Sequence, residues 1–304
     1  MAAQPYRGRF APTPSGPLHF GSLVAALGSY LDALSHAGTW LVRIEDVDPP
    51  RNVPGASDAI LRTLEAYGFE WEETVQYQSK RSDAYQEALE QLRQLGRVYA
   101  CSCTRKQLAD IARRGVDGPV YPGTCRARPN FDYAAALRLH VPAGRIVFAD
   151  GQQGLVACDV ATECGDFVLQ RADSVYAYHL AVVVDDAAQG VSHVVRGADL
   201  LTSTPRHIIL QRLLGLDAPN YLHLPVVLDE HGRKLSKQTL AAPIDARAPL
   251  PGLLQAAAFL GTPIDHPPQT PSEFWAWAVP AWSRRRLDPL RGRRWRAGSN
   301  PCKS

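Results

Sequence analysis

Hydrophobic residues near the N-terminus change their spacing abruptly, and this change predicts the first three elements. Residues 6–11 have the composition of a short strand, and Pro12, Pro14 and Pro17 then predict a turn, because proline cannot continue a β-ladder. Apolar residues next recur at helical spacing, which predicts a helix from about His19 to Gly38; they are Leu23, Ala26, Leu27, Tyr30, Leu31 and Leu34. The β-rich segment 39–44 follows as a strand.

This strand, turn, helix and strand form a βαβ unit, whose two strands are parallel. The sequence therefore predicts an open α/β sheet. Ligands of such sheets bind beyond the carboxyl ends of the strands, where residues 11–16 and 45–48 both lie. We expect these two segments to converge on one site.

The same alternation of helices and strands resumes after residue 175. Helical patterns cover residues 56–67, 83–95, 178–188 and 205–214, and β-rich stretches cover 146–148, 191–195 and 222–228. We expect a first half of the catalytic domain at 1–98, an insertion rich in Gly, Pro and Cys at 99–170, and a second half at 171–245. A helical segment at 246–283 and a flexible basic tail at 284–304 complete the predicted order.

Composition indicates a globular protein of the cytoplasm. The 304 residues are 45% hydrophobic, and the longest aliphatic stretch, residues 180–184, is too short for a signal peptide or a membrane span. The net charge is only +3, yet residues 284–303 carry eight basic side chains against Asp288. Such a tail either contacts nucleic acid phosphates or is a solvated, disordered end, and the sequence leaves both readings open.

Three of the six cysteines have the spacing of a metal site. Without a secretory signal the thiols are expected to be reduced. Cys101, Cys103 and Cys125, together with Tyr121, offer three thiolates and one phenolate, which suit a tetrahedral structural zinc ion. Tyrosine is a rare ligand, so free thiols are the alternative. The remaining cysteines fit no ligand spacing: Cys158, Cys164 and Cys302.

Two segments have the chemistry of phosphate binding. Residues 9–22 lead from a strand into a helix, where free backbone N–H groups, the close approach allowed by Gly16 and Gly21, and the His19 side chain favour an anion. Residues 234–238 place Lys234 and Lys237 on a loop that can close over a triphosphate. A pair of lysines on a loop is more often only solvated.

Together these segments resemble the HIGH and KMSKS signatures of class I aminoacyl-tRNA synthetases. They read His-Phe-Gly-Ser at 19–22 and Lys-Leu-Ser-Lys-Gln at 234–238, and residues 9–21, 43–48, 176–180 and 195–199 are similar to the glutamate-specific branch. Only 67 residues follow Lys237, too few for an anticodon-binding domain. The chain thus looks like the short glutamyl-Q tRNA(Asp) synthetase family, with a Rossmann-like α/β catalytic core, a zinc-binding insertion and no anticodon-binding domain.

The residue chemistry fits glutamate, because a diacid amino acid needs cations for its carboxylates and an anion for its ammonium group. The resemblance implies a glutamate pocket with Glu45 on the α-amino group and the arginines and Tyr178 on the carboxylates, and it leaves open which arginine takes which one. This pocket comprises Arg9, Phe10, Ala11, Pro12, Thr13, Glu45, Tyr178 and Arg196. Taken singly, each has a plain structural alternative, such as a surface ion pair between Arg43 and Glu45.

The resemblance also implies the reaction. Glutamate is activated by ATP, accompanied by Mg²⁺, and is transferred to queuosine at the wobble position of tRNA(Asp) rather than to a tRNA 3′ end. The implied ATP ligands are His19, Gly21, Lys234 and Lys237, of which His19 and the two lysines are the catalytic groups. The implied zinc ligands are Cys101, Cys103, Tyr121 and Cys125, and we expect a monomer.

The sequence departs from the family pattern at two places, and three alternative functions remain. Position 179 is histidine in the helix expected to face glutamate, where the family commonly has asparagine, and both side chains can hydrogen-bond a substrate. The lysine loop keeps both lysines but differs from KMSKS at two positions. The rivals are a fragment that charges a 3′ end, a small-molecule ligase, and a non-catalytic paralogue, which would be expected to lack His19 or Lys237.

Overall fold

The N-terminal βαβ unit forms where the hydrophobic spacing predicts it. β1 pairs in parallel with β2, and α1 connects them. Their bounds are Arg7–Phe10 (β1), Phe20–Ser35 (α1) and Thr39–Ile44 (β2). The computed structural model describes residues 5–115, 118–127, 135–229, 231–235, 242–264, 266–287 and 292–294. Lys237, a predicted catalytic residue, lies outside the described residues.

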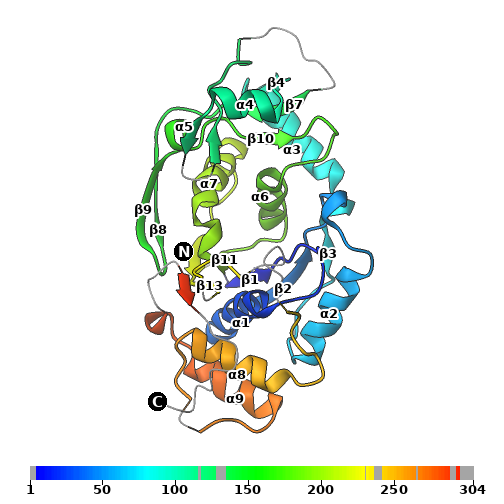
Figure 1. The fold of residues 1–304 in the computed structure, drawn as a ribbon, viewed down its shortest axis with the longest axis vertical. Helices are drawn as coiled ribbons and strands as arrows, with labels where there is room; N and C mark the ends of the chain where they lie inside the picture. The colour runs from blue at the N-terminus through cyan, green and yellow to red at the C-terminus, as the bar shows by residue number, and fades with distance from the viewer. Residues whose placement is uncertain are drawn as a thin grey trace.

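Parallel strands continue on both sides of this unit. β2 pairs with β3 (Gln76–Tyr77), and β11 (His193–Gly197) pairs in parallel with β12 (Asn220–Leu224). Backbone contacts join the two groups, because the Ser192 N–H donates to the Arg7 carbonyl at 3.0 Å. The carboxyl ends of β1, β2 and β11 therefore meet at one edge, in the middle of Figure 1.

Part of the segment predicted as an insertion belongs to this sheet. β8 (Arg145–Asp150) and β9 (Gly154–Asp159) form an antiparallel hairpin, and β8 pairs with β12 where Asp150 lies opposite Tyr221. Figure 1 shows the hairpin running down one side of the molecule towards β11. A second, three-stranded sheet at the far end contains β4 (Val98–Cys101), β7 (Ala136–Leu139) and β10 (Val168–Gln170).

The helices of the catalytic core start and end close to the predicted positions. They are α2 (Ala56–Ala66), α3 (Ser82–Gln94), α6 (Tyr178–Ala188) and α7 (Thr204–Leu214). The remaining elements are α4 (Arg105–Ile111), β5 (Arg113–Gly115), β6 (Gly118–Val120), α5 (Val160–Glu163), α8 (Pro249–Phe259), α9 (Pro271–Ala281) and β14 (Gly292–Arg294). The predicted single strand over 222–228 is wrong. Because Pro225 has no N–H for the ladder, the strand is divided into β12 and β13 (Val226–Leu228).

Two large apolar clusters hold these elements together. One surrounds α1, which contacts α8 and α9 and whose Leu27 and Leu31 are fully buried, and the other packs α3, α6 and α7 against β7 and β8. Among the described residues no helix is long and apolar enough to cross a membrane.

A buried ion pair attaches the start of the basic tail to α1. The Asp32 carboxylate, which is fully buried, accepts two hydrogen bonds from the Arg284 guanidinium at 2.7 Å, and it also accepts from the Tyr6 hydroxyl at 2.5 Å and the Trp282 indole at 3.1 Å. Burial acts to raise the pKa of Asp32, but the hydrogen bonds and charge of its partners hold that pKa below its usual value. The anchor therefore requires an ionised Asp32.

Replacing Arg284 with alanine is expected to lower the free energy of unfolding by about 2 kcal/mol, because a buried carboxylate loses its charged partner. The loss is expected in full above the pKa that Asp32 has in the unfolded chain, and it shrinks as pH falls through the lowered native pKa. Urea denaturation measures both effects. Arg285→Ala removes an exposed neighbour and is the control, with an expected change within about 0.5 kcal/mol. Equal losses for both variants would contradict the anchor.

Candidate active site

A cavity of about 880 Å³ lies at the carboxyl ends of β1, β2 and β11. Every described residue that the sequence predicts for glutamate or ATP lines it: Arg9, Phe10, Ala11, Pro12, Thr13, His19, Gly21, Glu45, Tyr178, Arg196 and Lys234. They come from β1 and the turn after it, from α1, from the end of β2, and from α6, β11 and the lysine loop. The structure thus brings together residues up to 225 positions apart in the chain.

The turn after β1 presents His19 at the start of α1. His19 is the N-cap residue, and its Nδ1 accepts a hydrogen bond from the Ser22 N–H at 3.3 Å. In the neutral ring the proton must then lie on Nε2, so this nitrogen is a hydrogen-bond donor. A Cβ on Gly21 would lie 3.1 Å from the His19 ring and 3.4 Å from the Leu235 carbonyl, so a residue without a side chain lets these groups approach.

A compact group of charges lies at one wall of the cavity, which Arg9 and Glu45 line. Arg9 and Arg43 both contact the Asp186 carboxylate, with shortest N–O distances of 3.0 and 2.8 Å. Burial favours the neutral form of Asp186, but the two arginines outweigh it and lower the pKa of this carboxyl. Arg9 is therefore already neutralised by the protein.

Glu45 lies beside this group but is less well compensated. Its Oε1 is 3.4 Å from Arg43 Nη2, which is a weak contact, and burial raises the pKa of Glu45 in spite of the nearby arginines. A cation that enters the cavity would stabilise the charged carboxylate. The position therefore suits an ammonium group.

Arg196 differs from Arg9 in its partners. Its Nη1 donates to the Tyr178 hydroxyl at 3.2 Å and its Nη2 to the Thr204 hydroxyl at 2.8 Å, and no carboxylate of the described part of the chain lies within 4.0 Å of its guanidinium. Arg196 is only 6% exposed. A buried guanidinium without an anionic partner is a strong site for a ligand carboxylate.

The predicted role of position 179 needs a correction. His179 does not line the cavity; its Nδ1 lies 3.1 Å from His207 Nε2, and His207 in turn contacts Arg196. The reason is geometric, since Tyr178 occupies the face of α6 that borders the cavity and the next residue of a helix points about 100° away. Histidine at this position therefore acts behind Arg196 and not on a substrate.

The lysine loop closes another side of the cavity. Lys234 forms an ion pair with Asp199, and Arg233 pairs with Asp229 at 2.9 Å. Arg233 also lines the cavity, as does Arg51 from the loop after β2. These two arginines add positive charge on the side where a triphosphate would lie, and neither belongs to the predicted set.

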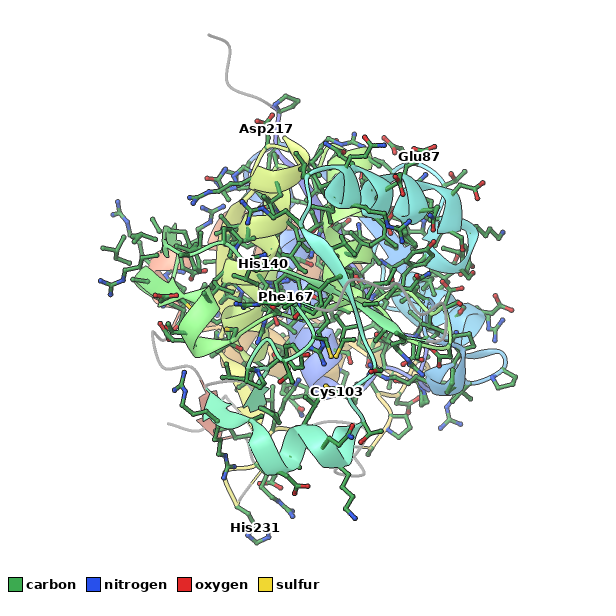
Figure 2. The ribbon with its side chains drawn as sticks, turned by 90° about the horizontal axis from the view of Figure 1, so that it is seen from above. Glu87, Cys103, His140, Phe167, Asp217 and His231 are labelled. Carbon is green, nitrogen blue, oxygen red and sulfur yellow. The ribbon has the colours of Figure 1, made fainter. Side chains whose placement is uncertain are left out.

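The cysteine segment lies at the opposite end of the molecule from α8 and α9, and Figure 2 looks onto this end and labels Cys103. The sulfur atoms of Cys101, Cys103 and Cys125 all lie within 4.8 Å of one another, with Cys103 and Cys125 at 3.5 Å. Four ligands at about 2.3 Å around zinc are about 3.8 Å apart. The donor set therefore fits a tetrahedral metal ion.

Tyr121 completes the cluster. Its hydroxyl lies 3.7 Å from Cys103 Sγ and accepts the Cys125 N–H at 2.9 Å. Burial would raise the pKa of the Cys125 thiol, yet hydrogen bonds from Tyr121 and Cys103 lower it to about 7, which favours a thiolate at neutral pH. The guanidinium of Arg138 lies over the Tyr121 ring, 4.1 Å from its centre, and fixes the ring in place.

Sequence reasoning missed the polar residues that hold Arg196. They are Asp150, Thr204, His207 and His223, which come from β8, α7 and β12. None has a motif around it. The available signal was a histidine between two leucines in the strand 220–224, where a buried polar side chain needs a partner.

Comparison with known proteins identifies relatives whose similarity extends over the catalytic core. The model of the family "tRNA synthetases class I (E and Q), catalytic domain" matches residues 6–248. The chain is 56% identical to the glutamyl-Q tRNA(Asp) synthetase of Dechloromonas aromatica over 92% of this chain and 94% of that protein, and 55% identical to that of Chromobacterium violaceum over 93% and 95%. The chain is also similar to the crystal structure of a glutamate tRNA ligase from Elizabethkingia meningosepticum in complex with its amino acid. That likeness has a TM-score of 0.79 and 25% identity, and it covers 97% of this chain and 68% of the other.

Proposed function

Because this chain belongs to the glutamyl-Q tRNA(Asp) synthetase family of class I synthetases, we propose that it activates glutamate with ATP and transfers it to queuosine in tRNA(Asp). The observation that carries the proposal is the cavity itself. It joins an uncompensated arginine, a poorly compensated glutamate and a helix N-terminus with a histidine donor in one space. These groups match the carboxylate, ammonium and phosphate groups of the reactants.

Glutamate is bound by complementary charges. Arg196 and the Tyr178 hydroxyl hold one carboxylate, and we assign them the side-chain carboxylate because Arg196, unlike Arg9, has no carboxylate partner among the residues that the structure describes. Glu45 binds the α-ammonium group, which compensates its buried charge. Arg9 stays paired with Asp186 and lines the cavity beside the reacting carboxylate.

Adenylate formation needs positioning and charge stabilisation, without a covalent enzyme intermediate. An oxygen of the glutamate α-carboxylate attacks the α-phosphorus of ATP, and the bond to the β-phosphate oxygen breaks, which releases pyrophosphate. His19 donates from Nε2 to a phosphate oxygen at the N-terminus of α1. Lys234 and Lys237 stabilise the charge that moves onto pyrophosphate, with Arg51 and Arg233 at the cavity wall in support.

The second step transfers the glutamyl group. A hydroxyl of the queuosine cyclopentenediol attacks the carbonyl carbon of the adenylate, its proton is released, and AMP leaves. The acceptor distinguishes this reaction from charging of a tRNA 3′ end. The identity of 55–56% to glutamyl-Q synthetases, against 25% to the glutamate tRNA ligase, supports the queuosine acceptor.

Two metal ions belong to the proposal. Cys101, Cys103, Cys125 and Tyr121 hold one zinc ion, which stabilises the cysteine segment and takes no part in the chemistry. Mg²⁺ accompanies ATP and neutralises part of its charge. We place the protein in the cytoplasm, where ATP and tRNA are present, and we expect it to be a monomer.

Metal analysis tests the zinc assignment. Freshly purified protein is expected to contain about one zinc ion per chain, and Cys103→Ser is expected to lose the zinc and to melt at a lower temperature, because a structural site stabilises the segment around it. Cys158→Ser changes a buried cysteine outside the cluster and is expected to retain the metal. Zinc-free wild-type protein, or equal zinc content in both variants, would remove the assignment.

Amino-acid-dependent exchange of labelled pyrophosphate into ATP tests the activation step. Exchange is expected with glutamate, both without and with tRNA. It is expected to be at least 100-fold weaker with glutamine, which has no side-chain carboxylate for Arg196, and with aspartate, whose side-chain carboxylate is one methylene group too short. Exchange driven equally by any of the three amino acids would exclude glutamate as the specific substrate.

A further inference from the structure

The guanidinium of Arg196 is held almost entirely by neutral acceptors. Its Nε donates to His223 Nε2 at 3.1 Å, and its Nη2 donates to the Thr204 hydroxyl at 2.8 Å and to the Leu200 carbonyl at 3.2 Å. His207 Nδ1 accepts a longer contact at 3.4 Å. Tyr178 and Leu200 line the cavity beside Arg196, whereas Thr204, His207 and His223 lie behind the guanidinium in buried protein.

The contact with His223 fixes the tautomer of that ring. An arginine N–H can only donate, so His223 Nε2 must accept and the ring proton must be on Nδ1. That Nδ1–H donates to Asp150 Oδ2 at 2.5 Å. Burial lowers the pKa of His223 to about 4, so the ring is neutral at physiological pH. If the proton were on Nε2, two donors would face each other.

Asp150 in turn is oriented by the backbone. Its Oδ1 accepts the N–H groups of Gln152 and Gln153 at 3.0 and 2.8 Å, in the turn between β8 and β9, and the His223 N–H at 3.3 Å. Asp150 and His223 are 5% and 0% exposed. The Asp150 charge is thus stabilised at a distance from Arg196, with an imidazole ring between them.

We propose that Asp150 and His223 are positioning residues which hold Arg196 in a fixed orientation without neutralising it, and so set the preference for glutamate over glutamine. This inference rests on the proposed glutamate pocket. A carboxylate in direct contact with Arg196 would cancel the charge that selects an anionic side chain, as Asp186 does for Arg9. A neutral, correctly protonated acceptor fixes the geometry and leaves the charge for the substrate.

The contrast between two substitutions at one position tests the pair. His223→Gln keeps an acceptor for Arg196 and a donor for Asp150, whereas His223→Leu keeps only volume. We expect the leucine variant to raise the KM for glutamate in pyrophosphate exchange at least about tenfold, with the KM for ATP unchanged. Its ratio of the inhibition constant of glutamine to the KM for glutamate is expected to fall. In His223→Gln, both the KM for glutamate and this ratio are expected to return most of the way to their wild-type values.

His193→Leu is the matched control, since His193 lies on the same strand as Arg196 but stacks on Tyr6 outside the cavity. Equal behaviour of the leucine and glutamine variants, or a parallel rise in both Michaelis constants, would overturn the inference. If His223→Leu fails to fold, Asp150→Asn decides. A raised KM for glutamate alone supports the pair, and an unchanged one overturns it.

The wild-type protein separates this inference from the function on which it rests. Glutamate-dependent exchange by wild type, with no shift in the variants, overturns the positioning roles and leaves the proposed function intact. Absence of that exchange in folded wild type overturns both.

Discussion

Replacing Arg196 with alanine is expected to raise the KM for glutamate by about 100-fold, while the KM for ATP changes less than about twofold. The substitution removes a buried cation of the cavity that no carboxylate of the described residues neutralises, and loss of one partner from a buried charged hydrogen bond corresponds to roughly 2–5 kcal/mol. Pyrophosphate exchange measures both constants, first with glutamate varied at saturating ATP and then with ATP varied at saturating glutamate.

Arg196→Lys provides the control for charge. It keeps a cation but cannot reproduce the fork of contacts to Tyr178, Thr204 and His223, so an intermediate KM is expected. Unchanged constants in Arg196→Ala would show that glutamate is bound elsewhere. A comparable rise for both substrates would instead indicate a general collapse of the cavity.

Replacing His19 with alanine is expected to lower kcat for pyrophosphate exchange by about 10²–10³, because one donor to the developing phosphate charge is lost. His19 also caps α1, so the alanine variant changes the helix as well. His19→Asn separates these effects. Asparagine can accept the Ser22 N–H as a cap but does not reach the phosphates as the imidazole does.

We therefore expect the two His19 variants to lose similar activity, while only the alanine variant loses stability, by about 1 kcal/mol. Activity retained by both folded variants would remove His19 from the mechanism. If asparagine alone restored activity, the role of His19 would be limited to capping the helix.

The sequence predicted the core elements well where periodicity was strong. The apolar stripe of α1 and the β-rich run of β2 gave elements that begin and end within three residues of the observed bounds, and α6 was predicted as Tyr178–Ala188. The class I catalytic fold followed from the two signature segments, and the family match confirms it. Matching motifs also pointed to the residues that line the cavity.

Other features depend on contacts that no local pattern encodes. Asp150 reaches His223 only because β8 pairs with β12, and the segment around Asp150 had the composition of an insertion into the sheet. The anchor between Asp32 and Arg284 joins residues 252 positions apart. An aspartate beside the apolar stripe of α1 was the one signal that α1 needs a cationic partner.

Transfer of radiolabelled glutamate to tRNA tests the central claim most directly. Purified protein and ATP are incubated with unfractionated tRNA from cells that make queuosine and from cells that cannot. The proposed function predicts label only on tRNA that contains queuosine. Equal label on both preparations would point to charging of a tRNA 3′ end, and no label on either, with pyrophosphate exchange intact, would contradict a tRNA acceptor.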